Sequence, residues 1–141
     1  MKSPTTRLFL DTSYAVALVS PSDYHHSRAV VLANRIDREE IPLVTTQAII
    51  LEIGNSLSRH RSRCAAVVLL EALHGDSKVE IVPLSDELYT EALGIYRSCM
   101  NKEWGLTDCL SFVVMRRHSL REALTTDRHF RQAGFSALLR D

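Results

Sequence analysis

Residues 7–13 read RLFLDTS, and this short segment sets the architecture that we expect for the whole chain. The apolar run that ends at Leu10 is too short for a helix and is typical of a buried β-strand. Asp11 stops the run, and Thr12 and Ser13 then open a helix-like stretch of small and apolar residues, 14–18. A strand followed at once by an acidic residue and a helix is a building unit of parallel α/β sheets.

The same alternation continues through the rest of the chain. Short apolar segments predict further strands at 43–46, 79–83, 122–126 and 137–139. Apolar residues at helical spacing predict helices at 23–38, 46–60, 63–74, 85–102 and 107–118, and the N-caps that we expect are Ser22, Thr46, Ser85 and Thr107. Strands that alternate with helices form parallel sheets covered on both faces. We therefore expect a three-layer α/β/α fold with a central parallel sheet of about five strands, in a single domain over 1–141.

The composition is that of an ordinary soluble protein. The 141 residues include 17 Lys and Arg and 17 Asp and Glu, a balance that argues against a broad basic face for nucleic acid. A local patch remains at Arg59, Arg61 and Arg63, where residues 57–64 contain no acid. No apolar run approaches the roughly 20 residues of a membrane span. Three cysteines without zinc-type spacing, and a polar beginning without a signal-peptide centre, lead us to expect a cytoplasmic protein.

Acidic residues stand where two of the predicted strands end. Asp11 follows the first strand, and Asp127 follows the fourth, directly after Thr125 and Thr126. Sites in parallel sheets form beyond the carboxyl ends of the strands, and neighbouring strands lie only ~4.8 Å apart. If these two strands are neighbours, their carboxylates face one small volume. The alternative for each residue is an Asp that only caps the following helix.

Two further acids lie in predicted helices. Asp108 stands in the first turn of the helix at 107–118, where the helix dipole favours an anion by ~0.3–1 kcal/mol, so capping would also explain it. Glu52 interrupts the apolar run 48–54, at the margin of a stripe that includes Ile49 and Ile53. A buried carboxylate without compensation costs several kcal/mol. Glu52 therefore needs a cation, a metal or water in a cleft.

Four carboxylates gathered in one place repel one another, and a hard divalent cation removes that repulsion. Ligation by oxygen alone suits Mg²⁺ or Mn²⁺ rather than zinc. Such ions activate water and stabilise the leaving oxygen in phosphodiester cleavage. The acids therefore point to a phosphate ester as the substrate.

The four acids lie in segments that together carry a family resemblance. The segments are FLDTS at 9–13, LEIGNSL at 51–57, LTDCLSF at 106–112 and TTDRHF at 125–130. In this order, over nearly the whole chain, they resemble PIN-domain ribonucleases, and the nearest group is the VapC toxins of bacterial toxin–antitoxin pairs. The resemblance implies that Asp11, Glu52, Asp108 and Asp127 hold Mg²⁺ or Mn²⁺ for RNA cleavage. It also implies a hydroxyl role for Thr12 or Ser13, a frequent homodimer and inhibition by a small antitoxin.

Two other functions fit parts of the pattern. An Asp-nucleophile phosphatase or phosphotransferase of another α/β fold would use Asp11. A haloacid-dehalogenase-type site requires a second Asp two residues later, where this chain has Ser13, and this disfavours it. A non-catalytic PIN-like binding module, whose acids only cap helices, would gain no stability from a divalent cation.

Several other side chains are candidates for contact with RNA. Arg128, next to Asp127, is a candidate phosphate ligand, and so are the arginines within 59–63, which are equally suited to hold an antitoxin. Tyr24 and Trp104 are candidates to stack on unpaired bases, although a lone aromatic is more often part of a core or an interface.

The histidines show no ligand spacing with a carboxylate that would indicate a metal site. We therefore expect His25, His26 and His129 to be solvent-exposed surface residues. His129 also lies near the presumed cleft, where it is a second candidate to bind phosphate.

Overall fold

A five-stranded parallel sheet forms the centre of the protein, whose computed structural model describes residues 6–140. The strands are β1 (Leu8–Leu10), β2 (Leu43–Thr46), β3 (Val79–Val82), β4 (Glu122–Leu124) and β5 (Ser136–Ala137). Their order across the sheet is β3-β2-β1-β4-β5, and every neighbouring pair is parallel. The predicted parallel sheet of about five strands is confirmed.

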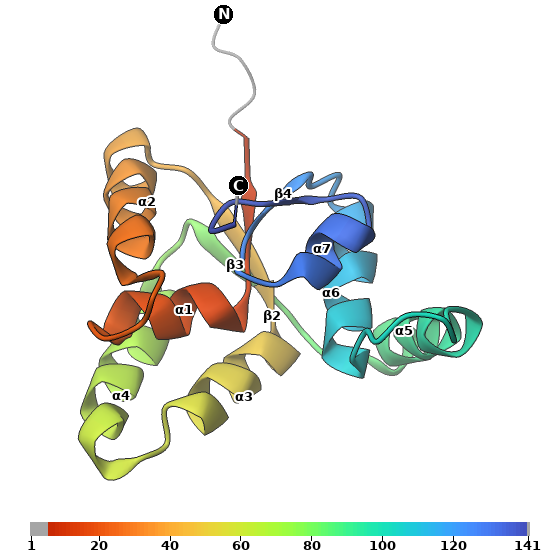
Figure 1. Cartoon of the computed structure of the whole chain (residues 1–141), viewed down its shortest axis with the longest axis horizontal. Coiled ribbons are helices and arrows are strands. Elements are labelled where there is room, and N and C mark those ends of the chain that lie inside the picture. Colours follow the sequence, from red (N-terminus) through yellow and green to blue (C-terminus); the bar gives the residue numbers. More distant parts are fainter. Residues whose placement is uncertain (1–5, 141) are drawn as a thin grey trace, which may run out of the picture.

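Helices cover both faces of this sheet. They are α1 (Thr12–Val19), α2 (His26–Glu39), α3 (Gln47–Ser56), α4 (His60–Gly75), α5 (Asp86–Ser98), α6 (Leu106–Arg117) and α7 (Arg128–Gln132). Helices α1 to α4 lie on one side of the sheet and α5 to α7 on the other, which confirms the three-layer α/β/α class (Figure 1). Within residues 6–140, no helix is both long enough and apolar enough to cross a membrane.

The strand order reverses between β1 and β4, and this places the site. From β1 the chain adds β2 and β3 on one side, then returns to add β4 and β5 on the other. Leu10 pairs with Leu124, and the backbone N–H of Asp11 donates to the carbonyl of Leu124 at 3.2 Å. The strands that precede Asp11 and Asp127, β1 and β4, are thus neighbours. Ligands of such sheets bind where the strand order reverses.

The core holds the elements that carry the acids. Residues 109–115 of α6 are all buried, as expected for a helix enclosed by a sheet and other helices. The Phe112 ring lies edge-on to Phe130 of α7, with ring centroids 5.1 Å apart, and Phe130 contacts Phe9 of β1 at 6.1 Å. These aromatic contacts hold α6 and α7 against β1.

Two of the expected N-caps are confirmed. The hydroxyl of Thr46 accepts a hydrogen bond from the N–H of Ile49 at the start of α3, and Ser85 caps α5 in the same way. The helix expected at 46–60 ends at Ser56, and the next begins at His60 instead of 63. The guanidinium of Arg63 donates to the carbonyl of Ser58 at 2.8 Å and stabilises the turn between them.

The other two expected N-caps are wrong. Helix α2 begins at His26 rather than after Ser22, because the Asp23 carboxylate accepts the N–H of His25 and keeps residues 23–25 in a turn. Helix α6 begins at Leu106 rather than after Thr107. The carboxylate of Asp108, in the first turn of this helix, accepts a hydrogen bond from the N–H of Gly105 and closes the turn there.

Other limits also differ from the sequence prediction, since β3 ends at Val82 instead of 83 and β4 ends at Leu124 instead of 126. Helix α5 ends at Ser98 instead of 102, and the last strand lies at Ser136–Ala137 rather than 137–139. Helix α7 is not predicted at all, because five residues are too few to display helical periodicity.

Candidate active site

Asp11 is the most deeply buried of the four predicted acids. It occupies the N-cap position of α1, yet its side chain makes no capping hydrogen bond. Its Oδ2 atom instead accepts hydrogen bonds from the hydroxyls of Thr125 (2.6 Å) and Ser13 (2.9 Å). Burial raises the pKa of Asp11 to about 6, in spite of these hydrogen bonds. The capping alternative therefore does not account for this residue.

The same two hydroxyls join the end of β1 to the end of β4. Ser13 Oγ accepts the backbone N–H of Thr126 at 2.9 Å, and Thr125 Oγ1 accepts that of Asp127 at 3.0 Å. The two hydroxyl oxygens lie 3.1 Å apart. This network fixes the backbone of Asp127 beside Asp11. Thr125 was not among the predicted site residues; its place directly before the TD pair was the available signal.

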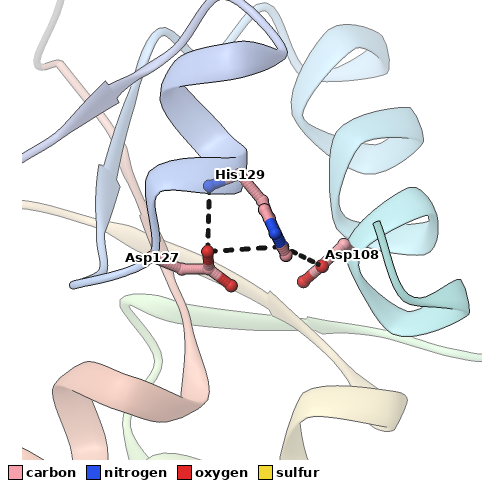
Figure 2. Close-up of side chains that lie close together, drawn as sticks. All are labelled: Asp108, Asp127 and His129. Carbon is pink, nitrogen blue, oxygen red and sulfur yellow. Dashed lines mark hydrogen bonds and ion pairs between the residues drawn. The ribbon is translucent and has the colours of Figure 1, made fainter. Parts of the chain in front are cut away.

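Asp108 and Asp127 meet across the imidazole of His129, as Figure 2 shows. His129 Nδ1 lies 3.0 Å from Asp108 Oδ2 and 3.4 Å from Asp127 Oδ1. The side chains of Asp108 and Asp127 are 19% and 34% exposed. Burial raises the pKa of Asp108, and the hydrogen bond with His129 opposes that rise. One histidine thus holds two carboxylates from separate helices together.

The expectation of a surface position for His129 is wrong. Its side chain is only 20% exposed, because the first turn of α7 directs the ring back toward Asp108 of α6. The Asp-x-His spacing of Asp127 and His129 was the signal in the sequence. Both acids do cap their helices, since Asp127 accepts the N–H of His129 and Asp108 accepts that of Gly105. For these two residues capping and membership of the cluster coexist.

Glu52 reaches the site from α3. Ile49 and Ile53 of that helix are fully buried, and Glu52 is half-buried beside them, as its place at the margin of the stripe predicts. Its Oε1 atom accepts a hydrogen bond from the hydroxyl of Thr12 at 2.6 Å. This contact ties α3 to the first residue of α1, next to Asp11.

A single cleft of about 750 Å³ collects these side chains. All the residues predicted for the site line it, namely Asp11, Thr12, Ser13, Glu52, Asp108, Asp127 and Arg128. Asp23, His25 and Arg140 line it as well. Arg140 was not predicted, and it donates to the backbone carbonyl of Thr126 at 3.1 Å.

The donor set suits a divalent cation. One ligand atom each from Asp108, Asp127 and His129 lie within 4.8 Å of one another. Asp11 and Glu52 add carboxylates to the same cleft. Carboxylate oxygens are the preferred ligands of Mg²⁺ and Mn²⁺, and an imidazole nitrogen extends the range toward transition metals.

A parallel α/β/α sheet with carboxylates gathered where its strand order reverses is the arrangement expected of a PIN domain. The sequence profile of the PIN domain matches residues 8–136, and the chain belongs to the PIN-domain family.

Individual relatives agree with this membership. Over 128 residues the chain is 27% identical to the 23S rRNA-specific endonuclease VapC20 of Mycobacterium tuberculosis, in each of two strains, with 91% of this chain and 95% of the relative covered. The crystal structure of that VapC20, described as a sarcin–ricin-loop-cleaving toxin, matches with a TM-score of 0.78 at 26% identity over the same shares. FitAcB from Neisseria gonorrhoeae matches with a TM-score of 0.63 at 19% identity, covering 92% of this chain and 94% of its own, and supports the fold alone.

Proposed function

We propose that this chain is a metal-dependent endoribonuclease that hydrolyses RNA phosphodiester bonds, and that it is the toxin of a VapBC-type toxin–antitoxin pair. The observation that carries the proposal is the convergence of Asp11, Glu52, Asp108 and Asp127 on one cleft. They come from four segments far apart in the chain, at the reversal of strand order. The relative VapC20, which is named as an rRNA endonuclease and a toxin, supports RNA as the substrate.

The chemistry of the cleft fits Mg²⁺ or Mn²⁺, held by Asp11, Glu52, Asp108 and Asp127. Asp11 is buried with hydroxyl partners, and burial raises its pKa to about 6 in spite of them. A divalent cation stabilises such a carboxylate as the anion. When bound, the cation lowers the pKa of water and neutralises charge on the phosphodiester.

The other side chains position the carboxylates and the substrate. Thr125 and Ser13 hold the Oδ2 atom of Asp11 through hydrogen bonds and fix the orientation of this carboxylate at the cleft. Thr12 orients Glu52 through its hydroxyl. Arg128 is exposed at the cleft, where its guanidinium is placed to bind a phosphate of the RNA.

The partners follow from the same proposal. A toxin has to be neutralised in the cell that makes it, which is why we propose a small antitoxin protein as a partner. We also propose a homodimer that acts in the cytoplasm without a membrane. Gel filtration with light scattering tests the dimer, and co-expression with the neighbouring gene product tests the antitoxin.

The activity is tested with purified protein and total RNA, with and without Mn²⁺, followed by mapping of the new 5′ ends. We expect discrete cleavage sites that need the cation and are lost in Asp108→Asn. Cleavage that survives EDTA, or that is equal in the variant, would contradict the proposal. Covalent labelling of Asp11 by beryllofluoride would instead support the phosphotransferase alternative.

A further inference from the structure

The connection between α1 and α2, residues 20–25, presents an aromatic side chain to solvent. Tyr24 is 94% exposed, whereas Tyr14 is buried and Tyr89 and Tyr96 are 43% and 49% exposed. A large aromatic ring that stays in water forgoes the free energy that its burial would gain, and both of its faces remain available to stack on a ligand. Among the four tyrosines of the chain, Tyr24 is therefore the one to explain.

Tyr24 stands at the rim of the catalytic cleft. The residues on either side of it, Asp23 and His25, both line the cleft that contains Asp11 and Glu52. The Tyr24 ring lies edge-on to the His25 ring, with centroids 4.9 Å apart and an interplanar angle of 78°. His25 therefore lines the cleft, and the Tyr24 ring packed against it faces open solvent.

Hydrogen bonds hold this connection in one conformation. The Asp23 carboxylate accepts the N–H of His25 at 2.8 Å, and the N–H of Asp23 donates to the carbonyl of Ser20 at 2.9 Å. The His26 ring contacts the carbonyl of Ala17 through Nδ1 at 2.8 Å and anchors the end of the connection to α1. Because the backbone is already ordered, a ligand that packs on Tyr24 loses little additional conformational entropy.

Arginine side chains lie on the other side of the connection at residues 20–25. Residues 20–22 line a second hollow, of about 380 Å³, together with Arg61 at the start of α4. Arg59 and Arg63, two residues before and after Arg61 in the chain, are also exposed, and residues 57–64 contain no acid. An aromatic platform between a phosphate-cleaving cleft and a group of arginines is the combination by which proteins bind single-stranded nucleic acid.

We propose that Tyr24 stacks on an unpaired base of the RNA substrate, next to the phosphodiester held in the cleft, and that the strand continues toward Arg61. The inference rests on the proposed ribonuclease function and specifies its substrate as RNA that is unpaired beside the cut. Stacking accepts any base, so Tyr24 positions the strand while other contacts select the sequence.

The experiment measures the affinity of the full-length protein for a fluorescein-labelled single-stranded RNA of 12 nucleotides and for the same strand without bases. Asp108→Asn serves as the background, so that the RNA stays intact. We expect Tyr24→Ala to weaken binding of the normal strand by roughly 10-fold and to leave binding of the abasic strand unchanged. Tyr24→Phe should keep the affinity, because the ring stacks without the hydroxyl.

Controls separate stacking from a change in the fold. Tyr96→Ala removes an exposed tyrosine from α5, away from the lining of the cleft, and should leave both affinities unchanged. Circular dichroism and the melting temperature should be the same for all variants. Equal affinities of Tyr24→Ala and its background, or an equal loss for both strands, would overturn the proposal.

The outcomes also distinguish this inference from the proposed function. Metal-dependent cleavage by the wild-type protein, combined with RNA binding that does not depend on Tyr24, would remove the stacking role alone. Tyr24-dependent binding without any cleavage would remove the ribonuclease activity and leave an RNA-binding surface.

Discussion

The two sides of the cleft hold their carboxylates by different means. At the β1 side, Asp11 is buried and its Oδ2 atom meets two hydroxyls. At the α6 and α7 side, Asp108 and Asp127 are partly exposed and share the imidazole of His129. Hydroxyls stabilise a carboxylate through hydrogen bonds alone, whereas an imidazole is also able to carry a positive charge.

Because of this difference, we expect substitutions on the two sides of the cleft to have different effects. Burial raises the pKa of Asp11 to about 6, so the anion at the β1 side costs folding free energy that a bound cation would offset. The α6 and α7 side contains its own group that bridges two acids, and it keeps its geometry without a metal. We therefore expect changes at Asp11 to affect activity and stability in opposite directions, and changes at His129 to affect mainly the affinity for the cation.

The largest effect is expected from Asp11→Asn. The amide keeps the size and still accepts hydrogen bonds from Thr125 and Ser13, but it removes the charge that Asp11 contributes to the proposed cation site. Substitutions outside the first coordination sphere of metal sites cost 10- to 100-fold, so loss of a ligand should lower the cleavage rate by more than about 100-fold. A gel assay with Mn²⁺ measures it. The matched control, Asp37→Asn on the exposed face of α2, should cleave at the wild-type rate, and a similar loss there would void the comparison.

The same variant should be more stable than the wild type in the absence of metal. Burial raises the pKa of Asp11 from 3.8 to about 6, so the folded state binds this proton more tightly than the unfolded state. That contribution is complete below pH 4 and is lost as the pH rises through about 6. Relative to Asp11→Asn, the wild type should lose about 2 kcal/mol of unfolding free energy between pH 4.5 and 7.5.

Urea unfolding in EDTA at the two pH values measures this difference. Asp11→Asn serves as the reference for the wild type, because the titration of all other groups is common to both proteins. A wild-type protein whose stability follows that of Asp11→Asn at both values would show that the carboxylate is solvated in solution.

Much of the fold follows from local patterns in the sequence. The strands at β1 and β2 are short apolar runs bounded by polar residues, and both are buried at every position. Asp11 and Asp127 were predicted because each directly follows a predicted strand, and sites of parallel sheets form beyond the carboxyl ends of the strands. In the structure β4 ends at Leu124, three residues before Asp127. Glu52 was found because a carboxylate inside an apolar run has to be compensated.

The contacts between these residues could not be predicted from the sequence, because they depend on how the helices pack against the sheet. The place of His129 depends on the edge-on packing of the Phe130 ring of α7 against the Phe112 ring of α6, which holds the two helices together. In the sequence Thr125 resembles any polar residue at the end of a strand. Its contact with Asp11 depends on the register between β1 and β4. The exposure of Tyr24 depends on the turn that Asp23 stabilises, and helix periodicity gives no account of that turn.

A smaller effect is expected from His129→Ala, which tests the other side of the cleft. Without the imidazole, Asp108 and Asp127 repel each other directly and lose the contact that fixes their orientation. Loss of such an orienting partner should weaken Mn²⁺ binding by roughly 10-fold. Isothermal titration in the absence of RNA measures it, and His74→Ala, an exposed residue at the end of α4, is the control. Unchanged Mn²⁺ affinity in His129→Ala would remove the distinction between the two sides.

The smallest effect is expected from Thr12→Val, which changes shape least and removes one hydrogen bond. Thr12 donates to Glu52 Oε1 at 2.6 Å, and both residues are half-buried, so water replaces part of the lost contact. A hydrogen bond to a charged group contributes ~1.5–3 kcal/mol when buried, and the partial exposure reduces this to about 1 kcal/mol, or a factor of about 5 in cation affinity. Thr12→Ser keeps the hydroxyl and should retain wild-type affinity. If both variants bind Mn²⁺ as the wild type does, Glu52 needs no orienting contact, and the hydroxyls of this cleft matter only where they meet the buried Asp11.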